Sequence, residues 1–336
     1  MIGQLADRYL ADLDATMRSV VDDLVTAPDF GVSIRYPLGW VDQDGKPYQQ
    51  MTGKRIRPLL LLLCAEAAGG DWRDALPAAA AVELLHNFSL VHDDIEDASP
   101  TRHGRPTVWT IWGQANAINV GDALFALAYC ALERLSDRVP PDIALKVWRI
   151  FNLTNIELTR GQHFDMRFET QPLVTVDEYL SMIRGKSAAL VAACAQIGAL
   201  IGGRDETIAA HYADFGLNLG IAFQIRDDIL GIWGDPDVTG KSAATDILSR
   251  KKSLPVLYGL ARSPELVALY GRDVFAEVEV EQAVTTLDSI SAREYSEGVE
   301  ETYYRQALQA LERADSKGDA ARALSSLAQA LFHRAQ

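Results

Sequence analysis

The chain has 336 residues, of which 48% are apolar, and its 32 basic and 46 acidic residues give a formal net charge of −14 at pH 7. This apolar content is enough to bury a large core, so the composition excludes a disordered or fibrous protein. So acidic a chain is repelled by polyanions, which argues against nucleic acid as a partner, although a local group of Lys and Arg could still bind a small anion.

Apolar residues recur at three- and four-residue steps along most of the chain, and this spacing predicts helices. The first predicted helix covers residues 4–26, and residues 28–52 then form a predicted loop because they contain three Pro and three Gly. No linker divides the helices that follow, so we predict one all-α domain over residues 1–336. The further predicted helices lie at about residues 58–69, 75–97, 114–135, 141–168, 176–203, 205–232, 242–262, 274–290 and 293–334.

The sequence also bears on the location of the protein. The cysteines Cys64, Cys130 and Cys194 lie far apart in apolar segments, which predicts reduced core residues in a reducing compartment. The first residues mix charged and apolar side chains, unlike a signal peptide. The most apolar stretches, residues 58–70 and 187–203, fall short of the roughly 20 apolar residues that a spanning helix needs. We therefore predict a cytoplasmic protein that does not span a membrane.

The first motif with chemical meaning is Asp93–Asp97 (DDIED), at the end of a predicted helix. Asp93 and Asp97 are one helical turn apart and face the same way. Two such carboxylates repel each other unless a cation lies between them, and Mg²⁺ favours oxygen ligands of this kind, completing its shell with water and phosphate. A solvated helix end is the alternative interpretation, but acidic groups at a helix C-terminus oppose the helix dipole.

A second acidic pair, Asp227 and Asp228, follows the apolar residues 215–225 in another predicted helix. If the two helices pack in parallel, the two acidic groups face each other across the mouth of a cavity. That arrangement would hold several Mg²⁺ ions around one diphosphate.

Basic residues accompany both acidic groups. The segment Gly53–Pro58 (GKRIRP) opens a predicted helix, and a helix N-terminus is a favourable place for an anion. Each basic residue taken alone is more often a solvated charge. The candidates are Lys54, Arg55, Arg57, Arg102, His103, Arg105, Lys186, Lys241, Lys251 and Lys252.

Taken in order, these motifs resemble those of the trans-type prenyl diphosphate synthases from about residue 50 to residue 260. The matching segments are Gly53–Pro58 (G-K-R-x-R-P), Asp93–Asp97 (D-D-x-x-D), Lys186-Ser187 (K-T/S), Phe223–Asp228 (F-Q-x-x-D-D), Gly240-Lys241 and Lys252-Ser253. The resemblance implies the isoprenoid synthase fold, a single helical-bundle domain around a central cavity. It also implies a Mg²⁺-dependent trans-prenyltransferase that joins isopentenyl diphosphate to dimethylallyl, geranyl or farnesyl diphosphate.

The resemblance further implies a role for each matching residue. Asp93 and Asp97 would bind two Mg²⁺ ions with support from Asp94, and Asp227 with Asp228 would hold a third. The implied catalytic residues are Asp93, Asp94, Asp97, Lys186, Asp227, Asp228 and Lys241. The implied contacts to the allylic diphosphate or its metals are Arg102, Lys186, Ser187, Gln224, Lys241 and Lys252. Those to isopentenyl diphosphate are Lys54, Arg57, His86 and His103.

Two positions depart from the family pattern. His103 replaces the second Arg of the usual Arg-Arg-Gly, which puts its contact with isopentenyl diphosphate in doubt unless Arg105 substitutes for it. Gly231 stands where the second motif usually ends in a third aspartate. The supporting ligand at that point is therefore lost or comes from elsewhere, for example from Asp235.

The resemblance also bears on product length, because residues just before the first motif form the floor of the cavity. Phe88, five positions before Asp93, followed by Ser89 without an insertion in the motif, resembles enzymes that make geranylgeranyl diphosphate. A farnesyl or longer-chain product is the alternative. The rest of the floor is expected from neighbouring helices, including residues around 116–123.

Two other functions stay open. A class I terpene cyclase shares the fold and the metal-assisted ionisation but needs no second diphosphate site, so Lys54, Arg57 and His86 argue against it. A catalytically inactive regulatory subunit commonly lacks the first acidic motif, which is intact here. Members of the family are usually homodimers, so the resemblance implies a homodimer. Beyond about residue 263 the charge pattern predicts only amphipathic covering helices.

Overall fold

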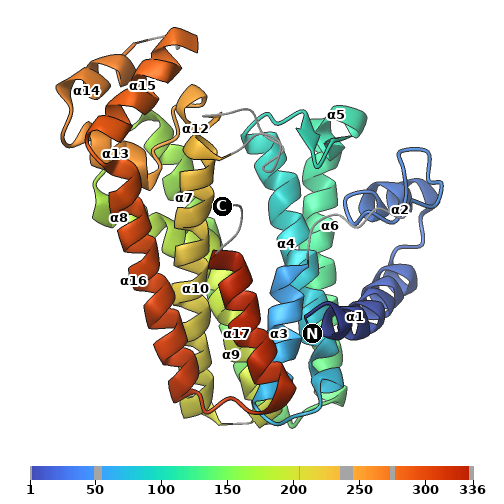
Figure 1. Cartoon of the computed structure of the whole chain (residues 1–336). Helices are drawn as coiled ribbons and strands as arrows, with labels where there is room; N and C mark the ends of the chain where they lie inside the picture. Colours follow the sequence, from blue (N-terminus) through green and yellow to red (C-terminus); the bar gives the residue numbers. More distant parts are fainter. Residues whose placement is uncertain (1, 49–54, 204, 235–244, 273–276, 333–336) are drawn as a thin grey trace. The chain divides into compact units, whose positions relative to one another are not determined.

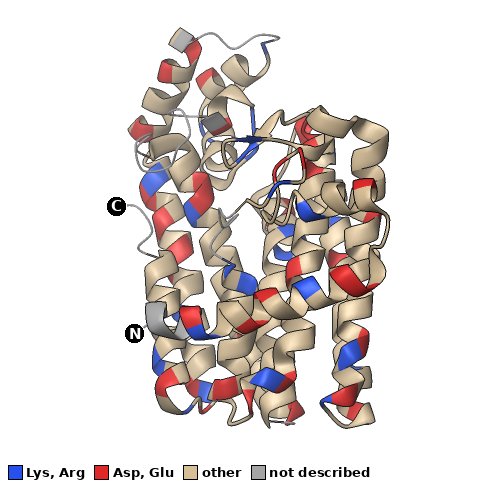
Figure 2. Cartoon of the chain, turned by 90° about the vertical axis from the view of Figure 1, so that its right-hand side faces the viewer, with Lys and Arg blue, Asp and Glu red and all other residues tan. Residues whose placement is uncertain are grey.

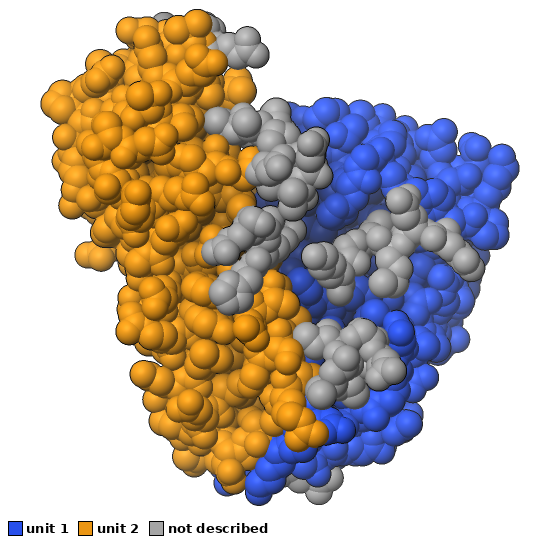
Figure 3. All heavy atoms as spheres, viewed as in Figure 1, with its two compact units in different colours: residues 1–148, 197–205, 317–320 blue, residues 149–196, 206–316, 321–336 orange. Residues whose placement is uncertain are grey.

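The computed structural model describes the chain except for residues 1, 49–54, 204, 235–244, 273–276 and 333–336. The described residues form helices and one short antiparallel hairpin (Figure 1). This architecture confirms the predicted all-α class. Contacts divide the chain into two compact units, coloured separately in Figure 3: unit 1 comprises residues 1–148, 197–205 and 317–320, and unit 2 comprises residues 149–196, 206–316 and 321–336.

Unit 1 is built around α4, which lies beside α6 and also packs on α1 and α3 (Figure 1). A Cβ at Gly121 of α6 would lie 2.2 Å from the His92 ring of α4, so only glycine allows this approach. The elements in this unit are α1 (Ile2–Leu24), α2 (Pro28–Arg35), α3 (Ile56–Ala67), η1 (Trp72–Ala75), α4 (Leu76–Glu96), β1 (Thr101–Arg102), β2 (Arg105–Pro106), α5 (Val108–Trp112), α6 (Gln114–Glu133), η2 (Arg134–Asp137) and the start of α7 (Pro141–Thr170).

Unit 2 is built around α10, which packs along α16. Its core joins apolar side chains of α8, α10 and α13, among them Tyr179, Ile225 and Leu254. The elements in this unit, together with the rest of α7, are α8 (Val176–Ile183), the π-helical turn η3 (Arg184–Ala188), α9 (Ala189–Gly203), which continues into unit 1, α10 (Glu206–Trp233), α12 (Thr245–Leu248), α13 (Leu254–Leu260), α14 (Pro264–Tyr270), α15 (Glu277–Ser289), α16 (Ala292–Arg313) and α17 (Gly318–Phe332).

The structure differs from the prediction in two segments, one near the N-terminus and one in the middle of the chain. The predicted loop 28–52 contains the helix α2, which starts at Pro28, a residue whose fixed φ suits the first helical position. The single predicted helix 176–203 is interrupted by the π-helical turn. There the backbone of Gly185 approaches Gly161 of α7, and a Cβ on Gly161 would lie 2.1 Å from the Lys186 nitrogen.

Two predicted helices are each broken by residues in the left-handed conformation. The predicted helix 242–262 stops after α12, where Arg250 has φ 55°, and α13 restarts the helix with a Pro in its first turn. The predicted helix 293–334 ends at Arg313, and Asp315 (φ 48°) and Gly318 (φ 72°) then turn the chain into α17. Apolar periodicity continues across these breaks, which explains why the sequence pattern missed them.

Two helical stretches, Gln114–Asp137 and Val176–Gly203, are long and apolar enough to cross a membrane by length and composition alone. Of the most apolar 18 residues in each stretch, 44% are buried inside the protein in the first stretch and 61% in the second. Buried helices of a helical core have the same composition, so neither stretch demonstrates a membrane span.

Acidic and basic residues lie along the helices throughout the chain (Figure 2). Among the described residues, one ion pair with both side chains buried joins two helices of unit 2: Arg226 on α10 contacts Glu300 on α16. Both Nε–Oε1 and Nη2–Oε2 distances are 2.8 Å, and the side chains are 6% and 1% exposed. Burial raises the pKa of Glu300 to about 7, an effect larger than the lowering by Arg226.

We predict that Glu300→Ala destabilises the protein by about 3–5 kcal/mol at pH 8, because it leaves the Arg226 guanidinium buried without its carboxylate. Urea unfolding measures this free energy. The matched control is Glu301→Ala, since the neighbouring Glu301 forms an exposed pair with Arg305 at 3.8 Å and should cost less than about 1 kcal/mol. Equal losses in the two variants would show that the buried pair does not hold α10 against α16.

Candidate functional site

The first acidic group forms the last turn of α4. Asp93 is partly exposed (side chain 23%), Asp94 is buried (7%) and Asp97 is exposed. The helix ends because Ala98 turns left-handed (φ 49°) and the Ser99 N–H donates back to the Asp94 carbonyl at 2.9 Å. This C-terminal cap holds Asp93 and Asp97 one turn apart on a helix that ends immediately afterwards.

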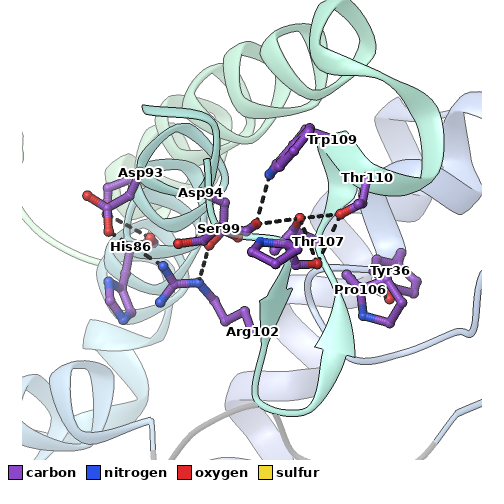
Figure 4. Close-up of polar contacts among 12 residues, drawn as sticks. Tyr36, His86, Asp93, Asp94, Ser99, Arg102, Pro106, Thr107, Trp109 and Thr110 are labelled. Atoms are coloured by element: carbon purple, nitrogen blue, oxygen red, sulfur yellow. Dashed lines mark hydrogen bonds and ion pairs between the residues drawn. The ribbon is translucent and has the colours of Figure 1, made fainter. Parts of the chain in front are cut away.

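A short hairpin brings Arg102 onto this acidic turn. Arg102 Nε donates to Oδ1 of Asp94 at 2.8 Å, and its Nη2 lies 3.5 Å from Oδ2 of Asp93 (Figure 4). The two-residue turn has positive φ at both His103 (51°) and Gly104 (75°), the geometry that matches the twist of a tight hairpin. Burial raises the pKa of Asp94 more than Arg102 lowers it. Asp94 is therefore a buried partner of Arg102, while Asp93 and Asp97 stay accessible.

The hairpin is itself held by the segment that follows the acidic turn. Thr107 Oγ1 donates to the Ser99 carbonyl at 2.9 Å, and Trp109 Nε1 donates to the same oxygen at 2.8 Å (Figure 4). Thr110 Oγ1 donates to the Pro100 carbonyl at 3.1 Å. These bonds make the end of α4, the hairpin and α5 one connected structure around Arg102.

Arg105 faces the N-terminal segment rather than the acidic turn. Its guanidinium lies over the rings of Tyr36 (4.0 Å) and Tyr48 (4.3 Å), and Nη2 donates to the Val41 carbonyl at 3.0 Å. Cation–π contacts and a backbone hydrogen bond thus fix Arg105 in place. Since it has these partners, Arg105 is poorly placed to substitute for His103, which lies exposed at the tip of the hairpin.

Two of the residues expected to bind isopentenyl diphosphate lie together near the start of α3. Arg57 Nη1 lies 3.2 Å from Nε2 of His86 on α4. Burial, reinforced by Arg57 and other nearby positive charges, holds the pKa of His86 well below its usual value, so the neutral ring accepts this hydrogen bond. Arg55, the residue just before α3, has a left-handed backbone (φ 44°), and its side chain pairs with Asp14 at 3.0 Å. Lys54 lies outside the described residues.

Phe88 is part of a row of aromatic rings. Its ring centroid lies 5.0 Å from Phe125 of α6, Phe125 lies 5.1 Å from Tyr129, and Tyr129 lies 5.7 Å from Trp148 of α7. The α6 rings come shortly after the predicted floor residues 116–123.

Ser89 has a local role in the described structure. Its hydroxyl donates to the His86 carbonyl at 2.8 Å within α4. The hydroxyl therefore satisfies its hydrogen bond within its own helix.

In unit 2 the π-helical turn η3 presents Lys186 and Ser187. Lys186 Nζ forms an ion pair with Asp165 of α7, and Ser187 Oγ donates to Oε1 of Gln224 at 2.6 Å. Turns of this type occur often at functional sites. The sequence analysis missed Asp165, because nothing local connects it with a lysine on another helix.

The second acidic pair divides into a buried and a partly exposed residue. Asp228 is 1% exposed at its side chain and Asp227 is partly exposed. The buried carboxylate accepts four hydrogen bonds, so it orders its surroundings. The donors are the Tyr179 hydroxyl (2.6 Å), Gln224 Nε2 (3.0 Å), Lys251 Nζ (3.3 Å) and the Leu254 N–H (3.3 Å).

Two neighbouring lysines have different partners. Lys251 pairs with Asp228, and the negative charge of Asp228 raises the pKa of Lys251. The Lys251 Nζ also lies 3.7 Å from Oδ2 of Asp246. Lys252, the predicted diphosphate contact, instead donates to the carbonyls of Phe168 (2.6 Å) and Gln171 at the end of α7. The sequence alone does not show that these adjacent lysines have different partners. Lys241 and Asp235 lie outside the described residues.

The donor set fits Mg²⁺ bound together with a substrate. In the described ranges no three His, Cys, Asp or Glu side chains gather into a metal site of their own. Mg²⁺ is usually held by one or two carboxylates, with waters and phosphate oxygens filling the other positions. Asp93, Asp97 and Asp227, which are at least partly exposed, are suited to that kind of binding.

Comparison with known proteins agrees with this geometry. The sequence model of the family described as "Polyprenyl synthetase" matches residues 40–287. The chain is 45% identical over 246 residues to a (2E,6E)-farnesyl diphosphate synthase of Mycobacterium tuberculosis, covering 73% of this chain and 67% of that protein. It is 43% identical over 270 residues to a geranylgeranyl diphosphate synthase of the same organism, covering 79% and 76%.

A solved structure extends the comparison to the whole chain. The crystal structure of a polyprenyl synthetase from Streptomyces coelicolor A3(2) superposes with a TM-score of 0.90 at 36% identity, covering 98% of this chain and 99% of that one. The predicted isoprenoid synthase fold is thereby confirmed.

We predict that Lys251→Ala weakens the binding of inorganic diphosphate with Mg²⁺ by about 10- to 100-fold, because a charge-assisted hydrogen bond is lost. Calorimetric titration measures the affinity. Lys252→Ala is the matched control and should lower the melting temperature while leaving the affinity within about twofold, since Lys252 binds carbonyls of α7. The opposite pattern would return the diphosphate contact to Lys252.

Proposed function

Since the chain belongs to the polyprenyl synthetase family, whose members are trans-prenyltransferases, we propose that it makes geranylgeranyl diphosphate. The reaction joins isopentenyl diphosphate to an allylic diphosphate. The observation that supports the proposed product length is the row of rings that begins at Phe88, because such aromatic side chains at the floor of the proposed cavity would limit how long a chain it accepts.

The accessible aspartates are proposed to hold the metal ions. Asp93 and Asp97 would bind two Mg²⁺ ions on the allylic diphosphate, and Asp227 would bind a third. When bound, Mg²⁺ supplies positive charge that stabilises the departing diphosphate. Asp94 and Asp228 do not bind metal in this proposal, because Arg102 donates to Asp94 at 2.8 Å, closer than its 3.5 Å contact with Asp93, and Asp228 already accepts four hydrogen bonds. They keep the neighbouring aspartates in position.

The basic side chains are proposed to bind the allylic diphosphate and to neutralise the charge that develops on it. Arg102 lies at the first acidic turn, Lys186 beside Asp165, and Lys251 beside Asp228. Each is held by a carboxylate before substrate binds, so little reorganisation is needed when the allylic bond ionises. Ser187 and Gln224, which bond to each other, complete this group, with Lys241 as the remaining candidate.

The second substrate is proposed to bind at the start of α3. Lys54 and Arg57 would contact isopentenyl diphosphate, and neutral His86 orients the Arg57 guanidinium by accepting a hydrogen bond from it. His103 is a further proposed contact from the hairpin tip. The alkene of this substrate attacks the allylic cation, and loss of a proton to the released diphosphate completes the reaction. Apolar surroundings protect the cation from water.

The relatives leave two product lengths in competition. The Mycobacterium farnesyl diphosphate synthase and geranylgeranyl diphosphate synthase match this chain at 45% and 43% identity, so overall similarity does not separate them. The single Phe at position 88, with the small Ser89 beside it, favours the twenty-carbon product. A farnesyl product is the second candidate.

We also propose a cytoplasmic homodimer that does not span a membrane. Leu145, Leu153 and Ile156 lie along one face of α7, and their side chains are 72%, 53% and 62% exposed. Such an exposed apolar stripe on a long helix is typical of a surface that pairs with another protein surface. A second copy of the chain is the proposed occupant.

We predict that the purified protein converts farnesyl and isopentenyl diphosphates, with Mg²⁺, into a discrete twenty-carbon product. Mass spectrometry of the dephosphorylated alcohol, repeated with dimethylallyl and geranyl primers, measures its length. Phe88→Ala should lengthen the product because it opens the wall. Phe30→Ala, which alters a 40% exposed ring, serves as control. A fifteen-carbon wild-type product would favour the farnesyl alternative, and no chain growth with any primer would favour an inactive subunit.

Two further variants separate ionisation from substrate binding. Asp93→Ala should reduce kcat by about 100-fold or more, since a Mg²⁺ ligand is lost at the leaving group. Lys54→Ala should chiefly raise KM for isopentenyl diphosphate, by about tenfold, because a diphosphate contact is lost. Steady-state kinetics distinguishes the two. Full activity of Asp93→Ala would refute the metal assignment, and turnover without isopentenyl diphosphate would point to a terpene cyclase.

A further inference from the structure

The space beside Gly231 is filled by a carboxylate from another element. Gly231 lies on α10 one helical turn after Asp227, at the position where the second acidic motif lacks its third aspartate. A Cβ built on Gly231 would lie 2.4 Å from Oδ2 of Asp246, 2.5 Å from its Cγ and 2.9 Å from its Oδ1. Real side chains do not approach this closely. The Asp246 carboxylate therefore occupies the place of a side chain at position 231.

Local structure holds Asp246 in this place. The residue lies on α12, which packs against α10, and it is 8% exposed. After α12 the chain turns back through Arg250 (φ 55°), and the Lys251 N–H donates to the Asp246 carbonyl at 2.9 Å. The same turn brings the Lys251 ammonium within 3.7 Å of the Asp246 carboxylate and 3.3 Å of Asp228. One lysine thus links the second acidic motif to Asp246.

We propose that Asp246 supplies the carboxylate that the second acidic motif lacks, and that Gly231 is required to make room for it. Residues one turn apart on a helix share a face, so a carboxylate lying over Gly231 is beside Asp227. In this proposal α12 donates the second carboxylate to that face, at the helical position that Asp97 takes after Asp93 in the first motif. The inference rests on the proposed function, because it assigns Asp246 to the Mg²⁺ ion that Asp227 holds.

The packing predicts opposite effects on stability and on metal binding. The atoms that a new Cβ would meet belong to the end of the Asp246 side chain, which can rotate away without a shift of the backbone. Ala is also a better helix former than Gly. Gly231→Ala should therefore leave the melting temperature unchanged or raised while it displaces the Asp246 carboxylate. A merely structural role for Gly231 would lower stability and metal binding together.

The test is calorimetric titration of the full-length protein with Mg²⁺ in the presence of inorganic diphosphate, together with thermal unfolding. Gly231→Ala and Asp246→Asn should each weaken Mg²⁺ binding by about tenfold, and the double variant should be no weaker than Asp246→Asn alone, since both changes remove the same interaction. Gly298→Ala on α16, where an added Cβ meets nothing within 4 Å, is the matched control and should bind as the wild type does.

A rescue variant distinguishes placement of the carboxylate from loss of charge. Gly231→Asp combined with Asp246→Ala returns one carboxylate to the face of Asp227 and should recover part of the lost affinity. Unchanged Mg²⁺ binding in Gly231→Ala, additive losses in the double variant, or no recovery in the rescue variant would each overturn the inference while leaving the proposed function intact. Failure of the wild type to bind Mg²⁺ with diphosphate would overturn both.

Discussion

Adjacent carboxylates on a helix repel each other, and both acidic groups relieve this repulsion in the same way. In each pair the buried aspartate is neutralised by a cation of the protein: Asp94 by Arg102, and Asp228 by Lys251. The other aspartate of each pair stays accessible. Consecutive residues of a helix point about 100° apart, and in both pairs the second aspartate is the one turned toward the interior.

This division explains why distant segments of the chain matter to the acidic groups. In unit 1, Arg102 reaches Asp94 only because a hairpin with two left-handed residues turns it back toward α4. Arg105 in turn fastens the hairpin to the N-terminal segment through Tyr36 and Tyr48. The segment between the helices is therefore not a passive connection.

The helices beyond residue 263 have a comparable role in unit 2. The sequence predicted only covering helices there, yet α16 contributes Glu300, whose buried pair with Arg226 lies immediately before Asp227. A fixed Arg226 limits the rotation of α10 about its own axis. The rotation of α10 about this axis sets which of the two aspartates that follow Arg226 is buried. The Arg226–Glu300 pair therefore helps to orient the second acidic motif.

Sequence reasoning succeeded where a signal is local. The helical class, the segments that carry Asp93 and Asp227, and the basic start of the helix that contains Arg57 could all be predicted from spacing. What it missed depends on contacts between elements. The different partners of Lys251 and Lys252 and the contact of Lys186 with Asp165 are set by packing that no sequence window contains. The single-domain prediction for residues 1–336 remains a prediction.

The two departures from the family pattern differ in physical kind. The space beside Gly231 is filled by Asp246, so charge lost from one helix is returned by another. His103 is different, because its flanking arginines are already committed, Arg102 to Asp94 and Arg105 to Tyr36 and Tyr48. A left-handed tip also suits histidine better than a bulky β-branched residue. The tip thus offers the two ring nitrogens of an imidazole where the family pattern has the five N–H donors of a guanidinium.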